Sequence, residues 1–243
     1  MTMHTGAAAL LIDVRADSRE RLLHVAMRLF AEHGIDGVSL KMISDAAGNR
    51  NKSAVCYHFE SKLGLVHAVL HRLHEDFAPQ IDARLTAFER AIAARRPPSL
   101  DDVVLGLLEP VMVLFAVNRY GPDALRALAR IMHEPLREMP LALRTSAKQL
   151  TRRVMDVLHR IMPEKPLAEL ELHLHHAIMA TVNGLAMHRR FLETHESLWG
   201  QAPLDEIFLS YAGYVAAGLA GRGLVLPPEK AAAWRLRLQP PGG

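Results

Sequence analysis

A short polar and basic segment, Arg50-Asn51-Lys52-Ser53, carries the side chains of this sequence that are best suited to binding chemistry. Asn can bind adenine through two hydrogen bonds, Arg and Lys can bind guanine or phosphate, and free amide groups at a helix start favour phosphate. The segment follows a glycine turn at Gly48 and precedes apolar spacing that predicts a helix through His58. Because the major groove of DNA admits one helix with such an N-terminal end, residues 51–58 are predicted to be the recognition helix of a helix-turn-helix.

Three short helices are predicted around this segment. The first begins at Asp17, where Glu20 completes a capping-box-like pattern, and ends at Gly34. Ser39 caps the second helix, and Asn51 caps the third. Since short helices bury little surface separately, we expect them to pack together through apolar residues at helical spacing. These residues are Leu22, Ala26, Leu29, Phe30, Ile43, Ala46, Ala47, Ala54, Val55 and Phe59.

The remaining chain is predicted to be helical as well. Half of the 243 residues are apolar, only 5% are aromatic, and helix formers abound, so we expect an all-α protein with almost no strand. Prolines begin at Pro79, which predicts a boundary between a helix at 61–77 and one at 80–95. Ser99 with Asp102 is predicted to cap the next helix. Further helices are expected at 121–135, from 140 onward, at 167–194 and at 203–220.

Several classes of protein are not expected. A single cysteine, Cys56, has no partner for an internal disulfide, fits a reducing cytoplasm, and is expected to be a small buried residue. The two longest apolar stretches, 103–117 and 204–221, are interrupted by acidic residues, so no membrane span is predicted. No glycine-rich phosphate loop, nucleophile elbow or paired-carboxylate motif occurs, so we expect neither an enzyme nor a cofactor or metal.

A longer pattern of apolar and small residues surrounds the predicted helix-turn-helix and ends in the motif His58-Phe59-x-x-Lys62. Its members are Leu22, Leu23, Ala26, Leu29, Phe30, Gly34, Val38, Ser39, Ile43, Ala46, Ala47, Gly48, His58, Phe59, Lys62 and Leu65. The pattern resembles the tetracycline-repressor (TetR) family of bacterial regulators. It covers about a fifth of the chain, and the remaining part agrees with that family only in its all-helical architecture.

The resemblance implies that side chains on the second and third helices, and at the start of the fourth, touch the DNA backbone or bases. Two departures from the family pattern lie in the recognition helix. Gly48 to Phe59 is one residue longer than the commonest spacing, and Cys56 stands where the family usually has tyrosine, which Tyr57 is expected to replace. The register is therefore open, and so is the choice of base-reading residues between 49 and 52. The predicted DNA-binding residues are Ser39, Lys41, Arg50, Asn51, Lys52, Ser53, Tyr57, His58 and Lys62.

The resemblance also implies that the C-terminal helices form a dimerisation surface and a cavity for a small effector. The helix at 167–194 has two apolar faces, of which one is expected to pair with a second copy and the other to border the cavity; ordinary core packing is the alternative for both. The candidate dimerisation residues are Leu174, Ile178, Leu185, Ala212, Ala216 and Ala217. The candidate effector-binding residues, several of them adaptable methionines, are Leu107, Met112, Phe115, Met132, His176, Met179 and Asn183.

The chain is thus predicted to comprise a flexible arm at 1–16, a helix-turn-helix domain at 17–62, an effector and dimerisation domain at 63–221, and a loosely ordered tail at 222–243. The expected function is that of a cytoplasmic homodimer that represses transcription from a palindromic operator in double-stranded DNA and is released by a small, mostly apolar effector. Two alternatives are a helical protein-interaction module and a metal-responsive regulator. The second would use the histidine-rich helices, where His67 and His71 share one face, although zinc needs about four ligands.

Overall fold

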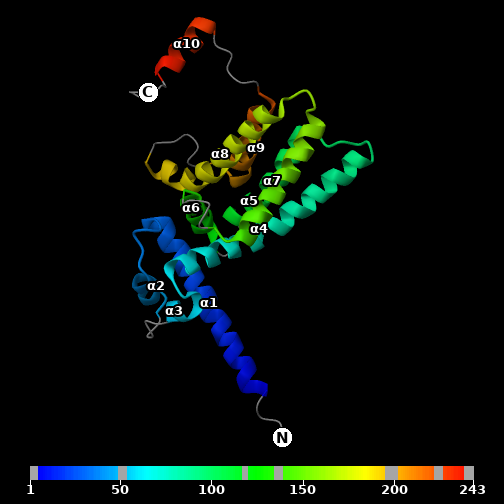
Figure 1. Cartoon of the computed structure of the whole chain (residues 1–243). Helices are drawn as coiled ribbons and strands as arrows, with labels where there is room; N and C mark the ends of the chain where they lie inside the picture. Colours follow the sequence, from blue (N-terminus) through cyan, green and yellow to red (C-terminus); the bar gives the residue numbers. More distant parts are fainter. Residues whose placement is uncertain are drawn as a thin grey trace.

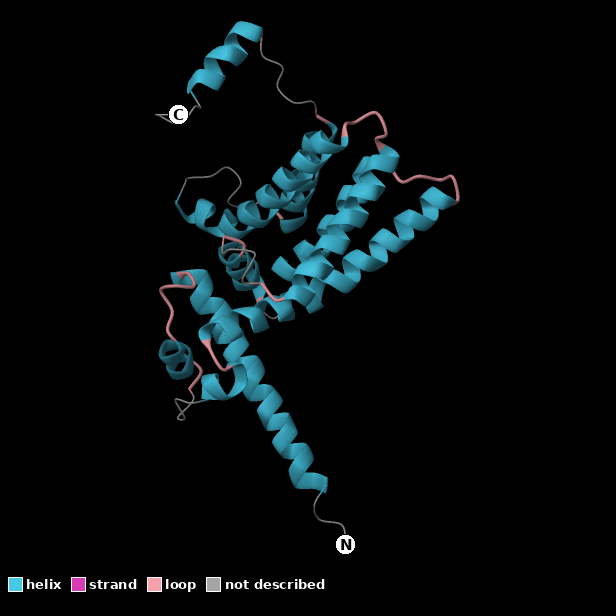
Figure 2. Ribbon diagram, in the orientation of Figure 1, coloured by secondary structure: helices cyan, strands magenta, loops and turns pink. Residues whose placement is uncertain are grey.

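In the computed structural model, the described residues form helices joined by short connections and include no strand (Figure 2). The structure describes residues 5–48, 54–116, 120–133, 139–194, 202–221 and 227–237. The all-α prediction is confirmed over these ranges. The helices are α1 (Thr5–His33), α2 (Leu40–Ala46), α3 (Ala54–Phe59), α4 (Lys62–Ala93), α5 (Leu100–Ala116), α6 (Gly121–Ile131), α7 (Leu141–Ile161), α8 (Leu167–Thr194), α9 (Leu204–Ala220) and α10 (Pro228–Arg237).

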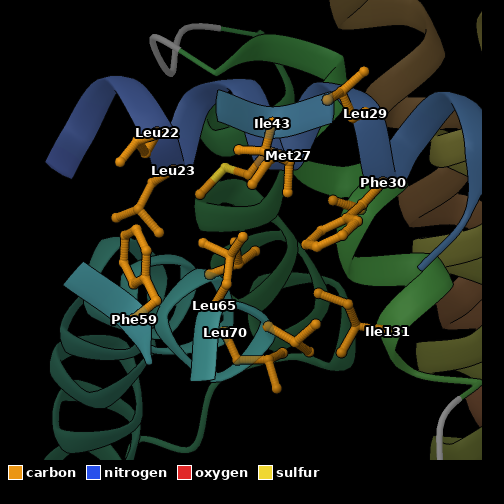
Figure 3. Packing of buried hydrophobic residues seen from close by; sticks show 14 of the residues in the cluster. Leu22, Leu23, Met27, Leu29, Phe30, Ile43, Phe59, Leu65, Leu70 and Ile131 are labelled. Carbon is orange, nitrogen blue, oxygen red and sulfur yellow. The ribbon is translucent and has the colours of Figure 1, made fainter. Parts of the chain in front are cut away.

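The first hydrophobic core joins α1, α2 and α3 to the first half of α4. These helices lie together at the N-terminal end of the molecule (Figure 1). Leu22, Met27 and Phe30 of α1 are fully buried and face Ile43 of α2 and Leu65 of α4 (Figure 3). The expected inward residues of the three short helices are therefore correct, apart from Ala46, which is exposed, and Ala54, whose side chain lies outside the described residues. The core holds α2 and α3 in place, because helices of seven and six residues are too short to be stable alone.

A second core lies in the bundle of α4, α5, α7, α8 and α9, whose members lie side by side in Figure 1. Leu85 of α4, Val103 of α5, Leu158 of α7 and Leu170 of α8 are buried in it. The predicted cap of α5 is confirmed, since Ser99 Oγ accepts from the Asp102 amide at 3.1 Å and Asp102 Oδ2 accepts from the Ser99 amide at 3.0 Å.

Helix α6 belongs to both parts of the molecule. Ala124, Ala127 and Ile131 pack into the core of the N-terminal helices, whereas Leu125 and Ala129 pack into a third cluster with α5 and α8. The predicted domain boundary after residue 62 coincides with the start of α4, but the N-terminal core draws on α4 and α6 as well.

Three predicted boundaries are wrong. Helix α1 begins at Thr5 and not at Asp17, because the Ala- and Leu-rich stretch before Asp17 continues the helix. Pro79 lies inside a continuous α4, where its ring is exposed. Proline lacks the amide that would donate a backbone hydrogen bond, and nearby the Gln80 side chain donates to the carbonyl of Asp76 at 2.8 Å. In the predicted tail, residues 228–237 form helix α10.

Candidate nucleic-acid interface

The start of α2 is fixed by Ser39, as the sequence predicts. Ser39 has extended backbone angles, and its Oγ accepts a hydrogen bond from the amide of Met42 at 3.2 Å, which satisfies one free donor of the helix start. Ile43 turns into the core, whereas Lys41 is exposed and pairs with Asp45 at 3.2 Å. A pair this exposed contributes little to stability, so the Lys41 ammonium remains available to a phosphate. Gly48 ends the helix with a φ of +67°, a conformation that favours glycine.

Helix α3 has one buried and one exposed side. Val55 and Phe59, one helical turn apart, are 0% and 5% exposed and anchor the helix on the core. Tyr57 is 68% exposed, and its ring meets the half-buried ring of His58 edge-on at 5.2 Å. Cys56 is also exposed, so the prediction of a buried cysteine is wrong; the anchors at positions 55 and 59 turn position 56 outward.

A tight turn joins α3 to α4. Glu60 has a φ of +63°, and Ser61 caps α4 by accepting from the Gly64 amide at 3.0 Å. Gly64 lies so close to α3 that a Cβ there would be 2.1 Å from the carbonyl oxygen of Phe59. Sequence reasoning missed this glycine, although it follows the His-Phe-x-x-Lys motif by two residues. The Lys62 ammonium donates to the carbonyl of Asp36 at 3.3 Å, which ties the start of α4 to the turn after α1.

The structure thus places five predicted DNA-binding residues on three successive elements of one unit, all of them exposed or half-buried. They are Ser39, Lys41, Tyr57, His58 and Lys62. The other four, Arg50, Asn51, Lys52 and Ser53, lie outside the described residues, between Gly48 and the first residue of α3.

The described residues among those predicted to bind an effector differ in their surroundings. Leu107 packs against the second core, Met112 is buried in the third cluster, and Asn183 donates to the Met179 carbonyl of its own helix at 2.9 Å. Met132 and His176 are exposed. The side chain of Phe115 lies outside the described residues.

A groove of about 430 Å³ lies elsewhere, between α4, α5 and α9. Phe88 and Phe208 supply its aromatic walls, and Arg84 forms an ion pair with Glu109 at its polar end. Gly106 allows the close approach of Phe88, since a Cβ there would lie 2.7 Å from the tip of that ring. The complete lining is Arg84, Phe88, Asp102, Leu105, Gly106, Glu109 and Phe208.

The predicted dimerisation face of α8 is wrong. Leu174 and Leu185 are 8% and 1% exposed, and Ala212 and Ala216 of α9 are 5% and 9% exposed, because all four are used in packing within the chain. Of the six candidates, Ile178 and Ala217 alone are exposed. The opposite face of α8, which was expected to border a cavity, is the outward one.

Exposed apolar side chains occur on both α8 and α9. On α8, Leu172 and Met187 are 53% and 51% exposed, and on α9, Leu209 and Tyr214 are 57% and 67% exposed. The two helices pack against each other through their buried sides. We call these four residues the α8–α9 face.

The part of the chain that the structure describes offers neither a metal cluster nor a membrane span. No group of three His, Cys, Asp or Glu side chains there is placed to hold a metal ion. None of the described helices has the length and apolar character that crossing a bilayer requires.

A capped short helix, a glycine turn, a second helix anchored by two apolar residues, and a helical bundle behind them define a helix-turn-helix protein. Residues 22–69 match the family model described as bacterial regulatory proteins, tetR family. Over these residues the chain is similar to the TetR family, as its sequence pattern predicts. The family is described as one of regulatory proteins, in agreement with the expectation that the chain is not an enzyme.

Individual relatives show how far the likeness extends. Over 69 residues the chain is 33% identical to an uncharacterized HTH-type transcriptional regulator, TtgW of Pseudomonas putida, a match that covers 27% of this chain and 51% of that protein. The chain thus spans about half the length of this curated relative.

Solved structures match over most of the chain. NalD, described as the secondary repressor of the MexAB-OprM multidrug efflux pump in Pseudomonas aeruginosa, has a TM-score of 0.54 and 20% identity, covering 85% of this chain and 97% of that chain. AmtR of Mycobacterium smegmatis has a TM-score of 0.55 and 19% identity, covering 92% and 96%. At such identities the likeness shows the fold alone.

Proposed function

We propose that the protein is a homodimeric transcriptional regulator that binds a palindromic operator through α2, α3 and the start of α4. The observation that carries the proposal is the cap, turn and anchor geometry of residues 39–48 and 54–64, which leaves polar and basic side chains outward on three successive elements. An N-terminal helix end, a cationic side chain and exposed polar groups are what a phosphate backbone and a major groove require. Such a regulator acts in the cytoplasm, where its DNA is.

The test is a fluorescence anisotropy titration with DNA selected from a random pool. Wild-type protein should bind the selected operator, and Lys52→Ala combined with Lys62→Ala should weaken binding through lost phosphate contacts. Lys148→Ala, an exposed lysine on α7, is the matched control and should bind like the wild type. Selection that yields no preferred sequence, or a double variant that binds as well as the wild type, would refute DNA binding and favour a protein-interaction module.

We infer that the second copy docks on the α8–α9 face. Its exposed Leu172, Met187, Leu209 and Tyr214 form an apolar surface on two neighbouring helices, and pairing two such helix pairs gives a four-helix bundle. A two-fold dimer places its recognition helices about one turn of DNA apart, roughly 34–36 Å.

Sedimentation equilibrium tests this assignment. Leu172→Asp combined with Tyr214→Asp should give a monomer, because a charge in an apolar interface lacks a partner. Leu141→Asp is the control, since Leu141 is 68% exposed on α7, away from this face. A dimeric double variant would place the interface elsewhere.

We further propose that an effector binds in the groove between α4, α5 and α9. Its volume falls in the range of small-molecule pockets, its walls are aromatic, and the Arg84–Glu109 pair offers polar partners. Pro110 cannot donate to the Gly106 carbonyl, which leaves an acceptor beside the groove. A small, mostly apolar effector with one polar end fits this lining.

We propose that the effector lowers operator affinity and that the protein is a repressor. NalD, which has a similar fold, is described as a repressor. A ligand that prefers the non-binding arrangement would shift the population by a coupling of about 1–3 kcal/mol. A panel of small aromatic compounds should include some that release the operator from the wild type. Phe208→Ala should bind the operator normally but lose that response; an unchanged response would place the effector elsewhere.

A further inference from the structure

A polar cluster joins the helix-turn-helix to the C-terminal bundle. The hydroxyl of Tyr120, the N-cap residue of α6, donates to Glu20 Oε2 of α1 at 2.6 Å. Arg72 of α4 also hydrogen-bonds to Tyr120 and pairs with Asp76 at 3.0 Å. We call Glu20, Arg72, Asp76 and Tyr120 the Tyr120 junction; it brings three helices to one hydroxyl group.

The junction lies in a buried setting. Tyr120 is 3% exposed and belongs to the same core as the anchors of α1 and α4, and the ring of His24 meets its ring edge-on at 5.4 Å. A buried hydroxyl without a partner costs free energy, so the bond to Glu20 is a condition for seating Tyr120 here. Movement of α6 away from α1 therefore breaks a specific polar contact as well as apolar packing.

The charge of Arg72 is held in place by its neighbours. Burial acts to lower the pKa of Arg72, but the charges of Asp76 and Glu20 and the contact with Tyr120 outweigh it and raise the pKa above its usual value. The Nε of Arg72 is nevertheless buried without a hydrogen-bond partner among the described residues. The junction is thus an incompletely satisfied network.

Helix α6 cannot shift against the bundle without affecting this contact. One side of α6 packs on the N-terminal core through Ala124 and Ala127, and the other side packs on α8 through Leu125 and Ala129. A displacement of α5 or α8 is therefore transmitted to α6 by direct contact, and Tyr120 precedes its first residue.

The junction also has a short route to the recognition helix. Arg19, next to Glu20 on α1, places its guanidinium 5.3 Å from the centre of the Phe59 ring. Phe59 is the last residue of α3 and one of its two core anchors. A shift of α1 at Glu20 thus moves the side chain that covers the end of the recognition helix.

We propose that Tyr120 is a positioning residue: its contact with Glu20 and Arg72 holds the helix-turn-helix against α6 in the arrangement that binds the operator. Opening of the junction lowers operator affinity, and the junction is the point at which a displacement in the bundle reaches α1. This inference rests on the proposed function, and it assigns the regulation of the same site to a hydrogen bond between distant parts of the chain.

The experiment compares full-length variants in operator binding and in hydrogen exchange of α1 and α6. Tyr120→Phe removes the hydroxyl and keeps the ring, and it should weaken operator binding about tenfold while exchange in the facing turns of α1 and α6 accelerates. Tyr211→Phe is the control, because it removes a half-buried hydroxyl on α9 that is remote from α1; both readouts should stay at the wild-type level. Glu20→Gln keeps an acceptor and should restore most of the affinity that Glu20→Ala loses.

A double-mutant cycle distinguishes positioning from mere stability. Glu20→Ala combined with Tyr120→Phe should bind no more weakly than either single variant, because the two changes remove one contact. Additive losses, or operator binding and exchange unchanged in Tyr120→Phe, would overturn the inference. A wild type that binds no selected DNA would instead refute the proposed function, and faster exchange in Tyr120→Phe would then still show the junction.

Discussion

Replacing Gly64 with alanine tests how tightly the turn between α3 and α4 holds the recognition helix. A Cβ at this position would lie 2.1 Å from the carbonyl oxygen of Phe59, whereas real Cβ contacts essentially never fall below 3.0 Å. The obstacle is a backbone atom that cannot rotate aside, so the end of α3 must move away from α4 by about 1 Å. Overpacking of this kind costs about 1–3 kcal/mol.

The same displacement is expected to reduce DNA binding. Helix α3 has six residues and is about 9 Å long, so a shift of about 1 Å at one end re-aims every outward side chain. We expect Gly64→Ala to bind the selected operator about tenfold more weakly, which corresponds to about 1.4 kcal/mol.

Urea unfolding and anisotropy titration measure the two effects separately. Gly218→Ala is the control: a Cβ there meets nothing within 4 Å, and alanine in a helix is favoured over glycine by about 0.5–1 kcal/mol. Gly64→Ala with wild-type affinity and an unchanged unfolding midpoint would refute the close approach of the two helices and its role.

Three further predictions concern other parts of the chain. Arg153 of α7 donates two hydrogen bonds to the carboxylate of Glu89 of α4, from Nε at 2.7 Å and from Nη2 at 2.9 Å. Arg153→Lys should therefore lower the free energy of unfolding, measured in urea, by about 1 kcal/mol. An unchanged free energy of unfolding would contradict a bidentate contact. Burial lowers the pKa of His74 and of His188, so on acidification the unfolded chain binds protons before the folded chain does. The thermal midpoint should therefore be constant above about pH 6.5 and should fall as the pH drops toward the lowered pKa values. A thermal midpoint that rises on acidification would contradict this prediction. The exposed thiol of Cys56, the one cysteine of the chain, should react with a thiol reagent about tenfold more slowly when operator is bound; equal rates would mean that α3 does not face DNA.

The helix-turn-helix was predictable because local signals determine it. Ser39 is a good cap, Gly48 accepts a left-handed turn, and Val55 and Phe59 are the apolar residues one turn apart in α3. Each of these properties depends on neighbours within a few residues. The closeness of Gly64 to α3 depends on the angle between two helices, which spacing alone does not give.

The C-terminal part shows where sequence reasoning stops. Apolar periodicity in α8 identifies two faces, but it does not tell which one packs within the chain: Leu174 of the predicted dimerisation face is buried, and Leu172 is exposed. Pro79 was expected to end a helix because proline lacks a donor, yet a single missing bond on the exposed side does not break a helix of 32 residues. The contact between Glu20 and Tyr120 spans 100 positions and has no local signal, so only the folded chain shows it.

We propose that α2, α3 and the start of α4 form a DNA-reading surface that a dimer presents twice. The most direct measurement is footprinting of the wild-type protein on its selected operator, with the binding constant followed over a range of salt concentrations. We predict two protected half-sites about one helical turn apart and an affinity that falls steeply with added salt as counterion release is lost. A single unrepeated footprint, or an affinity that is insensitive to salt, would contradict the account.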